Sequence, residues 1–234
     1  MTIENIILKY GQNVLLENAS FSLSPGHLTA LIGRNGSGKS TLLRALAWLR
    51  PPFGGSVCCD GKDLASITAS ERSRLVAFVN TERHRAPGLN CRQVVSLGRA
   101  PYTGWSGRMS DADRSAVDAA IMSVGMNDFA ERKVDTLSDG EYQRIMIARA
   151  IAQDTRAVLL DEPTAFLDYP NRRSTAALLR SLAKEKNKII LYSTHEIDLA
   201  MEYCDDILMM IPPEIVVGRK DDKKVLESVK KEFY

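Results

Sequence analysis

The stretch "LTALIGRNGSGKSTLLRALAWLR", residues 28–50, joins three patterns in an order that indicates the class of fold. "LTALIG" (28–33) is an apolar run typical of a buried strand, and "KSTLLRALAWLR" (39–50) has the apolar spacing of a helix. Between them, "GRNGSGKS" (33–40) fits G-x-x-x-x-G-K-[ST], the pattern of a phosphate-binding loop, in the strand-to-helix context that this pattern requires. The stretch therefore predicts a nucleotide-phosphate site on an α/β fold and leaves the reaction open.

The residue types of this loop explain how it would bind phosphate. Glycines let main-chain N–H groups turn toward phosphate oxygens, and the N-terminus of the following helix adds its dipole. Lys39 supplies a positive charge, and the hydroxyl of Ser40 can ligate magnesium.

Further functional side chains are expected where strands end. "AVLLDEPT" (157–164) indicates a buried strand with Asp161 at its carboxyl end, where α/β sheets place their ligands. We expect Asp161 to hold magnesium through water and Glu162 to polarise the attacking water. His195 ends another strand, "KIILYSTH" (188–195), and we expect it at the same edge of the sheet.

Apolar runs and helical patterns alternate along the chain, as in a parallel α/β sheet. "RLVAFVN" (74–80) is one further strand, and "IENIILKYG" with "VLLENASFSL" predicts an antiparallel pair ahead of the sheet. Residues 91–152 carry helical patterns and no convincing strand. The predicted organisation is a catalytic core with a β sub-domain (1–85 and 153–211), an inserted helical sub-domain (86–152) and a C-terminal tail (212–234). Within this tail, "GRKDDKKVLESVKKEF" (218–233) predicts a charged helix or a frayed end.

The composition is that of a soluble globular protein, with 44% hydrophobic and 26% charged residues. The net charge of +2 gives no electrostatic reason to expect nucleic acid as a partner. No apolar run approaches the ~18 residues of a transmembrane helix, and the N-terminus lacks the pattern of a signal peptide. The cysteines lack metal-binding spacing, and we expect them to be reduced: Cys58, Cys59, Cys91 and Cys204.

The segment "TLSDGEYQR" (136–144) predicts a capped helix N-terminus. Ser138 and Glu141 have the spacing of a capping box, in which each side chain accepts a hydrogen bond from the other's main-chain N–H. Gly140 lies inside this cap, where the absence of a side chain permits close approach to the backbone.

With these residues assembled, the chain resembles the ATP-binding cassette (ABC) family over essentially its full length. "LSDGEYQR" is similar to the signature motif of that family and lies twenty residues before the acidic strand end. The resemblance implies a P-loop NTPase core of the RecA-like type, with an antiparallel β sub-domain and an inserted α-helical sub-domain. It also implies a head-to-tail dimer in which two ATP molecules are sandwiched, each facing the signature helix of the opposite copy.

The resemblance assigns roles to matching positions. Tyr10 would stack on adenine, Asp168 in "AFLD" would bridge the two copies, and His195 would contact the γ-phosphate. Ser138 and Gly140 would contact the phosphate across the dimer interface. The phosphates and Mg²⁺ would be held by Gly33, Arg34, Asn35, Gly36, Ser37, Gly38, Lys39, Ser40 and Thr41.

Two further stretches narrow the resemblance. "SLGRAPYTGW" (96–105) and "LDEPTAFLDYP" (160–170) look like the ATPases of importers for iron–siderophore, haem or cobalamin complexes. Such ATPases form a dimer beneath a dimeric membrane permease that a substrate-binding protein supplies. The resemblance therefore implies a cytoplasmic subunit, peripheral on the inner face of the cell membrane.

Two departures from the family pattern stand out. Asp139 and Glu141 replace the first glycine and the glutamine of the signature motif. In "VAFVNTERHR" (76–85), Thr81 stands where the family has a glutamine that couples the nucleotide to the permease, and Glu82 is the alternative. We favour Thr81 as the residue near the magnesium shell.

Other functions fit the sequence less well. A soluble ABC ATPase that acts on ribosomes or DNA usually carries two cassettes or a long basic or coiled-coil insertion. A P-loop kinase or GTPase needs no "LSDGE" helix. A cassette that binds ATP without hydrolysing it is disfavoured because Lys39, Asp161, Glu162 and His195 are all present.

Overall fold

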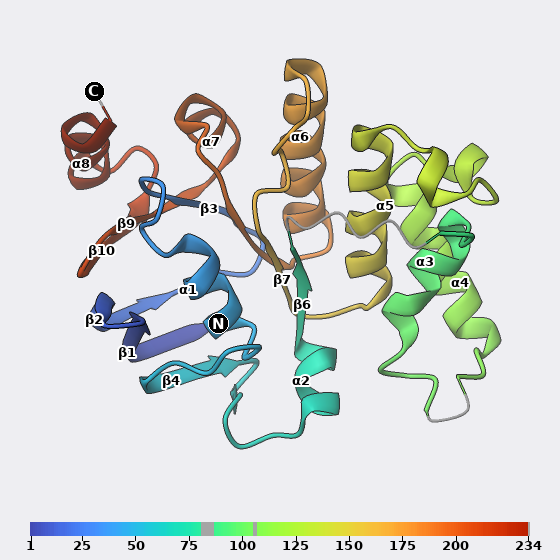
Figure 1. Ribbon diagram of the computed structural model, residues 1–234, viewed down its shortest axis with the longest axis horizontal. Coiled ribbons are helices and arrows are strands. Elements are labelled where there is room, and N and C mark those ends of the chain that lie inside the picture. Colours follow the sequence, from blue (N-terminus) through green and yellow to red (C-terminus); the bar gives the residue numbers. More distant parts are fainter. Residues whose placement is uncertain (81–86, 105–106, 234) are drawn as a thin grey trace.

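The computed structural model describes residues 1–80, 87–104 and 107–233. Its centre is a six-stranded sheet with the strand order β10-β9-β3-β8-β7-β6, and beside it lies a four-stranded sheet with the order β2-β1-β4-β5 (Figure 1). The strands of the larger sheet are β3 (Leu28–Ile32), β6 (Val76–Val79), β7 (Ala157–Leu160), β8 (Ile189–Ser193), β9 (Asp206–Ile211) and β10 (Glu214–Arg219). The strands of the smaller sheet are β1 (Thr2–Tyr10), β2 (Asn13–Ser22), β4 (Gly54–Cys59) and β5 (Lys62–Asp63).

The larger sheet is buried on both faces, as parallel sheets usually are. β6, β7, β8, β3 and β9 pair in parallel, and β10 adds an antiparallel edge. Alternate residues of one strand enter different clusters, since Ala30 packs on one side and Leu31 on the other. The carboxyl ends of the parallel strands consequently meet at one edge of the sheet.

Helix α1 (Lys39–Leu46) fills the space between the two sheets, where Leu42, Leu43 and Leu46 pack with apolar residues of β1 and β2. The helix predicted for 39–50 ends earlier, at Leu46, because Trp48 adopts a φ of 56°. The N–H of Leu49 then donates to the carbonyl of Arg44 at 2.9 Å, which is the hydrogen bond of a Schellman motif.

The smaller sheet contains the predicted antiparallel pair, and β1 and β2 run side by side over nearly their full lengths. Cys58 and Cys59 lie on β4, where Cys59 is buried and Cys58 is partly exposed, as strand alternation predicts. All four cysteines are free thiols. Arg50 and Phe53, just before β4, bring their side chains near Tyr10 and Lys9 of β1, respectively.

The helical segment projects from one side of the larger sheet (Figure 1). It contains α3 (Cys91–Ser96), α4 (Asp111–Ser123) and α5 (Asp139–Ala152), each opened by a capping box. No strand occurs among its described residues, which bear only an isolated bridge between Asn90 and Lys133. Its apolar side chains join the cluster that covers one face of the larger sheet.

The strand predicted for 74–80 begins two residues late, because Arg74 and Leu75 belong to helix α2 (Ala69–Leu75). A capping box of Thr68 and Glu71 starts this helix. The segment 212–234 contains β10, which extends the larger sheet, followed by α8 (Lys223–Phe233). The remaining helices are α6 (Tyr169–Glu185) and α7 (Ile197–Tyr203).

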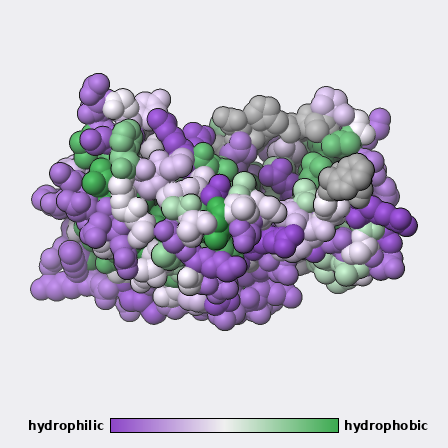
Figure 2. Space-filling view, turned by 90° about the horizontal axis from the view of Figure 1, so that it is seen from below, coloured by the Kyte–Doolittle hydropathy of each residue, from purple (hydrophilic) through white to green (hydrophobic). Residues whose placement is uncertain are grey.

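The surface carries mixed polar and apolar residues. On the face shown in Figure 2, hydrophilic residues dominate and hydrophobic ones form small separate patches. Within the described residues, no helix is both long enough and apolar enough to cross a membrane.

We expect Asp113 to make the stability of this fold depend on acid pH. Hydrogen bonds from the hydroxyl and main-chain N–H of Ser110, together with the Arg99 guanidinium, lower the pKa of Asp113 to about 2. A carboxyl whose pKa falls on folding stabilises the protein above its unfolded pKa of roughly 3.9 and loses that effect as pH falls toward the folded value. Asp113→Asn should therefore lower the urea midpoint at pH 7, and the difference from the wild type should shrink between pH 5 and pH 2.

The matched control is Asp111→Asn in the same helical turn, where the carboxylate side chain is 97% exposed. This variant should change the midpoint little at any pH. An Asp113→Asn deficit that is equally large at pH 7 and pH 2 would contradict the electrostatic explanation.

Candidate functional site

The main chain of the phosphate loop is hydrogen-bonded to the side chain of its own Lys39. Nζ of Lys39 donates hydrogen bonds to the carbonyl oxygens of Gly33 at 2.8 Å and Arg34 at 3.2 Å. Burial lowers the pKa of Lys39, while the carboxylates of Glu162 and Asp161 act in the opposite direction. A cation that is held in this way by main-chain oxygens lies directly where phosphate oxygens would be bound.

Two features of the loop fit a phosphate ligand. The Ser37 hydroxyl is buried and has no hydrogen-bond partner among the described residues. Gly33 has almost no room for a side chain, because a Cβ there would lie 2.7 Å from Oγ of Ser37 and 2.9 Å from the carbonyl oxygen of Met210. Buried polar atoms are normally paired, so an unpaired hydroxyl inside this loop fits a ligand oxygen.

The acidic strand end meets the loop directly. The main-chain N–H of Asp161 donates to the carbonyl of Val79 at 2.8 Å, and this bond fixes the residue at the end of β6. Oγ of Ser40 donates to Oδ1 of Asp161 at 2.9 Å. Asp161 is only 3% exposed. The residues that the sequence predicts for magnesium at two distant positions are therefore in contact.

Glu162 and His195 form the next layer of the site. Their side chains are in contact through Oε1 of Glu162 and Nε2 of His195. Glu162 has a φ of 48°, in the left-handed region that residues other than glycine rarely adopt. Its main-chain N–H donates to Oγ of Ser193 at 2.8 Å.

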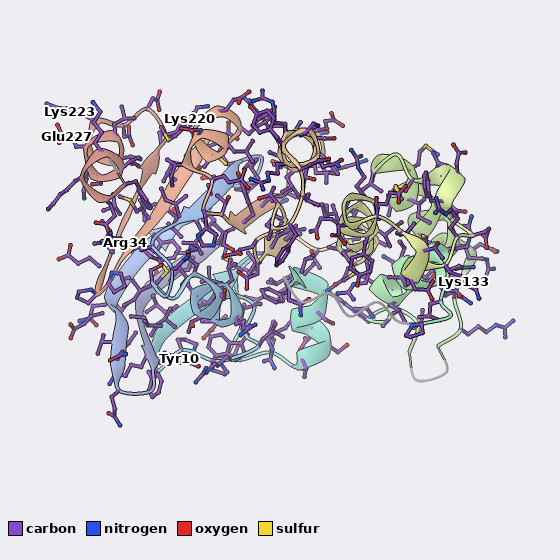
Figure 3. All side chains as sticks on the ribbon, turned by 45° about the horizontal axis from the view of Figure 1, so that its top comes forward. Tyr10, Arg34, Lys133, Lys220, Lys223 and Glu227 are labelled. Carbon is purple, nitrogen blue, oxygen red and sulfur yellow. The ribbon has the colours of Figure 1, made fainter. Side chains whose placement is uncertain are left out.

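Lys39, Ser40, Glu162 and His195 line one pocket of about 390 Å³. Tyr10 stands at its rim, 61% exposed, with the guanidinium of Arg50 lying 5.6 Å from the ring centroid. Tyr10, labelled in Figure 3, is the last residue of β1 in the β1–β2 hairpin. Among the residues that the structure describes, the lining comprises Tyr10, Asn13, Leu15, Asn35, Gly36, Gly38, Lys39, Ser40, Thr41, Glu162 and His195.

Arg34 points away from this pocket. Its side chain is 75% exposed, and Nε lies 3.8 Å from Oε1 of Glu232 on α8. Figure 3 shows Arg34 on the side of the molecule that carries this C-terminal helix. Within one chain, only the main chain of Arg34 could make the predicted contact with phosphate.

The signature helix α5 has the predicted cap, but the capped N-terminus lies away from the pocket. The N–H of Glu141 donates to Oγ of Ser138 at 3.3 Å, and the N–H of Ser138 donates to Oε2 of Glu141 at 2.7 Å. A Cβ on Gly140 would lie 3.2 Å from the side chain of Asn171 on α6. None of the described residues that line the pocket belongs to α5, so one chain does not bring Ser138 or Gly140 to its own phosphate loop.

Asp168 also lies outside the pocket. It is the N-cap of α6, and its Oδ1 accepts a hydrogen bond from the N–H of Asn171 at 3.0 Å. Asn171 therefore stands beside both Asp168 and Gly140, which places these two predicted interface residues in one neighbourhood.

Some residues of the site were not predicted. Asn13 and Leu15 line the pocket from β2, whose alternation indicates a strand and carries no ligand signal. Ser193 lies within an apolar run that predicts only a buried strand. The predicted coupling positions Thr81 and Glu82 lie outside the described residues, and their role stays a prediction.

The donor set suits magnesium that binds together with a nucleotide. Among the described residues, no group of three or more His, Cys, Asp and Glu side chains could hold a metal ion. Magnesium is commonly bound by one or two protein oxygens together with substrate phosphates, rather than by a protein cage. Ser40 and Asp161 provide such oxygens at the edge of the phosphate loop.

The fold and this site define a P-loop nucleoside triphosphatase. Comparison with known proteins specifies the class further. Residues 16–165 match the family model described as ABC transporter. The achromobactin transport ATP-binding protein of Dickeya dadantii is 38% identical over 208 residues, which are 89% of this chain and 77% of that protein. The iron(3+)-hydroxamate import ATP-binding protein of Bacillus subtilis is 34% identical over 203 residues, 87% of this chain and 76% of that protein.

A solved dimeric ATP-binding cassette in a post-hydrolysis state, bound to ADP and phosphate, superimposes with a TM-score of 0.80 at 26% identity. The superposition covers 94% of this chain and 99% of that one. The chain belongs to the ABC transporter family and is an ATP-binding cassette ATPase, which confirms the family, fold and enzyme class predicted from the sequence.

The crowding at Gly33 leads to a testable difference between two glycines of the loop. Gly36 has a φ of 78°, and a Cβ there would meet nothing within 4 Å, so Gly36→Ala adds backbone strain of ~1–2 kcal/mol and no clash. Gly33→Ala would in addition force Ser37 and the Met210 main chain apart, at a cost of ~1–3 kcal/mol.

Urea unfolding and binding of a fluorescent ATP analogue would compare the two variants. We expect Gly33→Ala to be the less stable variant and to lose far more affinity for the analogue. Equal affinities would show that the phosphate loop tolerates a shift at Gly33.

Proposed function

We propose that this chain is the ATP-hydrolysing subunit of an importer for an iron chelate (siderophore), haem or cobalamin. One observation carries the hydrolytic part: Ser40, Glu162 and His195 line one pocket beside the phosphate loop, and Ser40 is hydrogen-bonded to the buried Asp161. The sequence similarity to ATP-binding proteins named for achromobactin transport and for iron(3+)-hydroxamate import supports the transport part. These relatives favour an importer over a soluble cassette that acts on ribosomes or DNA.

In the proposed reaction, the residues of the phosphate loop bind the β- and γ-phosphates of ATP, and Tyr10 stacks on adenine. Ser40 and Asp161 would hold Mg²⁺, which neutralises phosphate charge when it is bound. Glu162 polarises the attacking water, and His195, in contact with Glu162, orients that carboxylate and faces the γ-phosphate.

The active form is proposed to be a head-to-tail dimer. Each chain carries an ATP pocket at one place and a signature helix N-terminus, with Ser138 and Gly140, at another. A helix N-terminus binds anions through its free N–H groups and its dipole, so the signature helix would complete the pocket of the opposite copy. The fold similarity to a dimeric cassette supports this arrangement, in which Asp168 lies between the copies.

The partners follow from the family. A membrane permease dimer would form the pathway for the substrate, and a substrate-binding protein would deliver it. This would place the chain in the cytoplasm, peripherally on the inner face of the cell membrane. The transport and import functions in the names of its relatives support the permease partner.

The first test of this function is Glu162→Gln. The amide keeps the shape of the side chain but cannot act as a base, so turnover should fall by ~10²–10⁴-fold while ATP still binds. Because hydrolysis normally opens the sandwich, the variant should accumulate as a dimer with ATP in gel filtration. In the source organism it should also abolish uptake of the radiolabelled iron chelate or cobalamin.

Glu185→Gln serves as the control, because this exposed residue lies at the end of α6 and accepts a hydrogen bond from Ser181. It should hydrolyse ATP like the wild type. Unchanged turnover in Glu162→Gln would remove Glu162 from its role, and a variant that stays monomeric with ATP would count against the sandwich.

Asp139 generates a second test, since it introduces a negative charge into the first turn of the signature helix. An acid there stabilises the helix by ~0.3–1 kcal/mol through the dipole. The same charge faces the incoming phosphate, and two unit charges 4 Å apart at a protein surface repel by about 4 kcal/mol before screening. Lys39 and magnesium offset part of this repulsion. Asp139→Gly should therefore tighten ATP-driven dimerisation modestly, and more at low salt.

Sedimentation of the Glu162→Gln background at low and high salt would measure the effect. Asp139→Asn separates charge from the added backbone freedom of glycine, and it should tighten the dimer as well. Weaker dimerisation in both variants would mean that stabilisation of the helix outweighs phosphate repulsion.

A further inference from the structure

Ser193 is a buried hydroxyl between the two strands that carry the site. It ends β8, which lies between β3 and β7 in the larger sheet, and it is 0% exposed. Its main chain pairs in register with Leu31 of β3, and the preceding residue, Tyr192, pairs with Leu160 of β7. The sheet thus fixes the backbone of Ser193 directly beside Asp161.

The hydroxyl of Ser193 contacts both functional carboxylate residues. Oγ donates to Oδ1 of Asp161 at 2.8 Å and accepts the main-chain N–H of Glu162 at 2.8 Å. A serine hydroxyl has one hydrogen to donate. Since the N–H of Glu162 can only donate, the Ser193 hydrogen is directed at Asp161, and the polarity of both bonds is fixed.

These bonds act where the backbone is strained. Glu162 has a φ of 48°, a conformation that persists only when the surroundings impose it. The bond from Ser193 holds the N–H of that residue, so it contributes to the orientation that brings the Glu162 side chain to His195. The Ser193 hydroxyl therefore constrains the side chain of Asp161 and the main chain of Glu162.

Ser40 also donates to Oδ1 of Asp161, but the proposed function makes Ser40 a metal ligand as well. Ser193 is not among the described residues that line the pocket, and the proposed function does not make it a metal ligand. Its bond to Asp161 is compatible with a bound nucleotide and metal.

Resting on the proposed function, we propose that Ser193 is a positioning residue for ATP hydrolysis. Its hydroxyl links Asp161 and Glu162 into one rigid unit, so that the carboxylate that orders the metal and the carboxylate that polarises water keep a fixed separation. Some hydrogen bonds orient a metal-binding carboxylate from a residue that does not itself touch the metal. Removing such a bond typically lowers metal affinity or activity by ~10–100-fold.

The test compares Ser193→Thr with Ser193→Val. Threonine and valine have the same branched shape and similar volume, and only threonine keeps the hydroxyl. We expect Ser193→Val to lower kcat about 10- to 100-fold relative to Ser193→Thr, with binding of metal-free ATP within about twofold, because Ser193 is not among the described residues that line the nucleotide pocket.

A second readout does not require turnover. Mn²⁺ binding in the presence of a non-hydrolysable ATP analogue, followed by electron paramagnetic resonance, should be about tenfold weaker in Ser193→Val than in Ser193→Thr. The control is Thr155→Val, which makes the same hydroxyl-to-methyl change at a buried threonine that donates to the carbonyl of Ala157 at 2.8 Å. It should leave kcat and Mn²⁺ affinity within about twofold of the wild type.

Equal kcat and equal Mn²⁺ affinity in the threonine and valine variants would overturn the proposal, because packing rather than the hydroxyl would then govern the site. If the valine variant does not fold, Ser193→Ala against the wild type gives the same two comparisons without added volume. A wild type without ATPase activity would contradict the proposed function, and the Mn²⁺ comparison would still decide the role of Ser193.

Discussion

The hydrogen bond from Ser40 to Asp161 joins two parts of the chain that are 121 residues apart in sequence. Ser40 lies in the first turn of α1 after β3, and Asp161 follows β7, which is separated from β3 by β8. The bond forms because parallel strands deliver their carboxyl ends to one edge, where the first turn of α1 also begins. The Lys39 contacts with the loop, the Glu162–His195 pair and the two bonds of Ser193 all surround this point. A sheet with a different strand order would separate these residues, even if every motif were intact.

The parts of the site that could be predicted depend on local chemistry. Glycine spacing, a lysine and a hydroxyl define a phosphate loop wherever they follow a strand, and the spacing of Ser138 and Glu141 defines a cap. What could not be predicted depends on pairing between distant segments. Ser193 looks like one more buried residue of β8 until β7 is placed beside it, and Leu15 reaches the pocket because β2 lies next to the loop. The early end of α1 was hidden because Trp48 takes the left-handed position that glycine usually signals.

In the proposed dimer, each chain would contribute two incomplete phosphate sites rather than a complete one. The phosphate loop and Glu162 lie at the pocket, while the N-terminus of the signature helix lies outside it. Gly140 faces Asn171, and Asn171 bonds to the Asp168 side chain that begins α6. The N-terminus of the signature helix therefore packs against α6, the helix that follows β7. This contact mechanically connects the two half-sites within one chain.

The orientation of the signature helix α5 depends on a set of contacts at its C-terminal end, which we call the joint. Tyr102 lies between the guanidinium groups of Arg99, 3.9 Å from its ring centroid, and Arg74 of α2, at 5.2 Å. Its hydroxyl donates to the carbonyl of Gln153, at the end of α5, at 3.1 Å.

The same joint ties α5 to the core from the other direction, because Nε2 of Gln153 donates to the carbonyl of Ser73 on α2 at 2.6 Å. Gly98 lies so close to α5 that a Cβ would be 2.3 Å from the carbonyl of Arg149. Any rotation of the helical segment against α2 must break or slide the contacts of Gln153 with Ser73 and of Tyr102 with Arg74. The stretch "SLGRAPYTG", which the sequence associates with one class of importer, thus acts in this structure as a packed joint and makes no contact with the nucleotide pocket among the described residues.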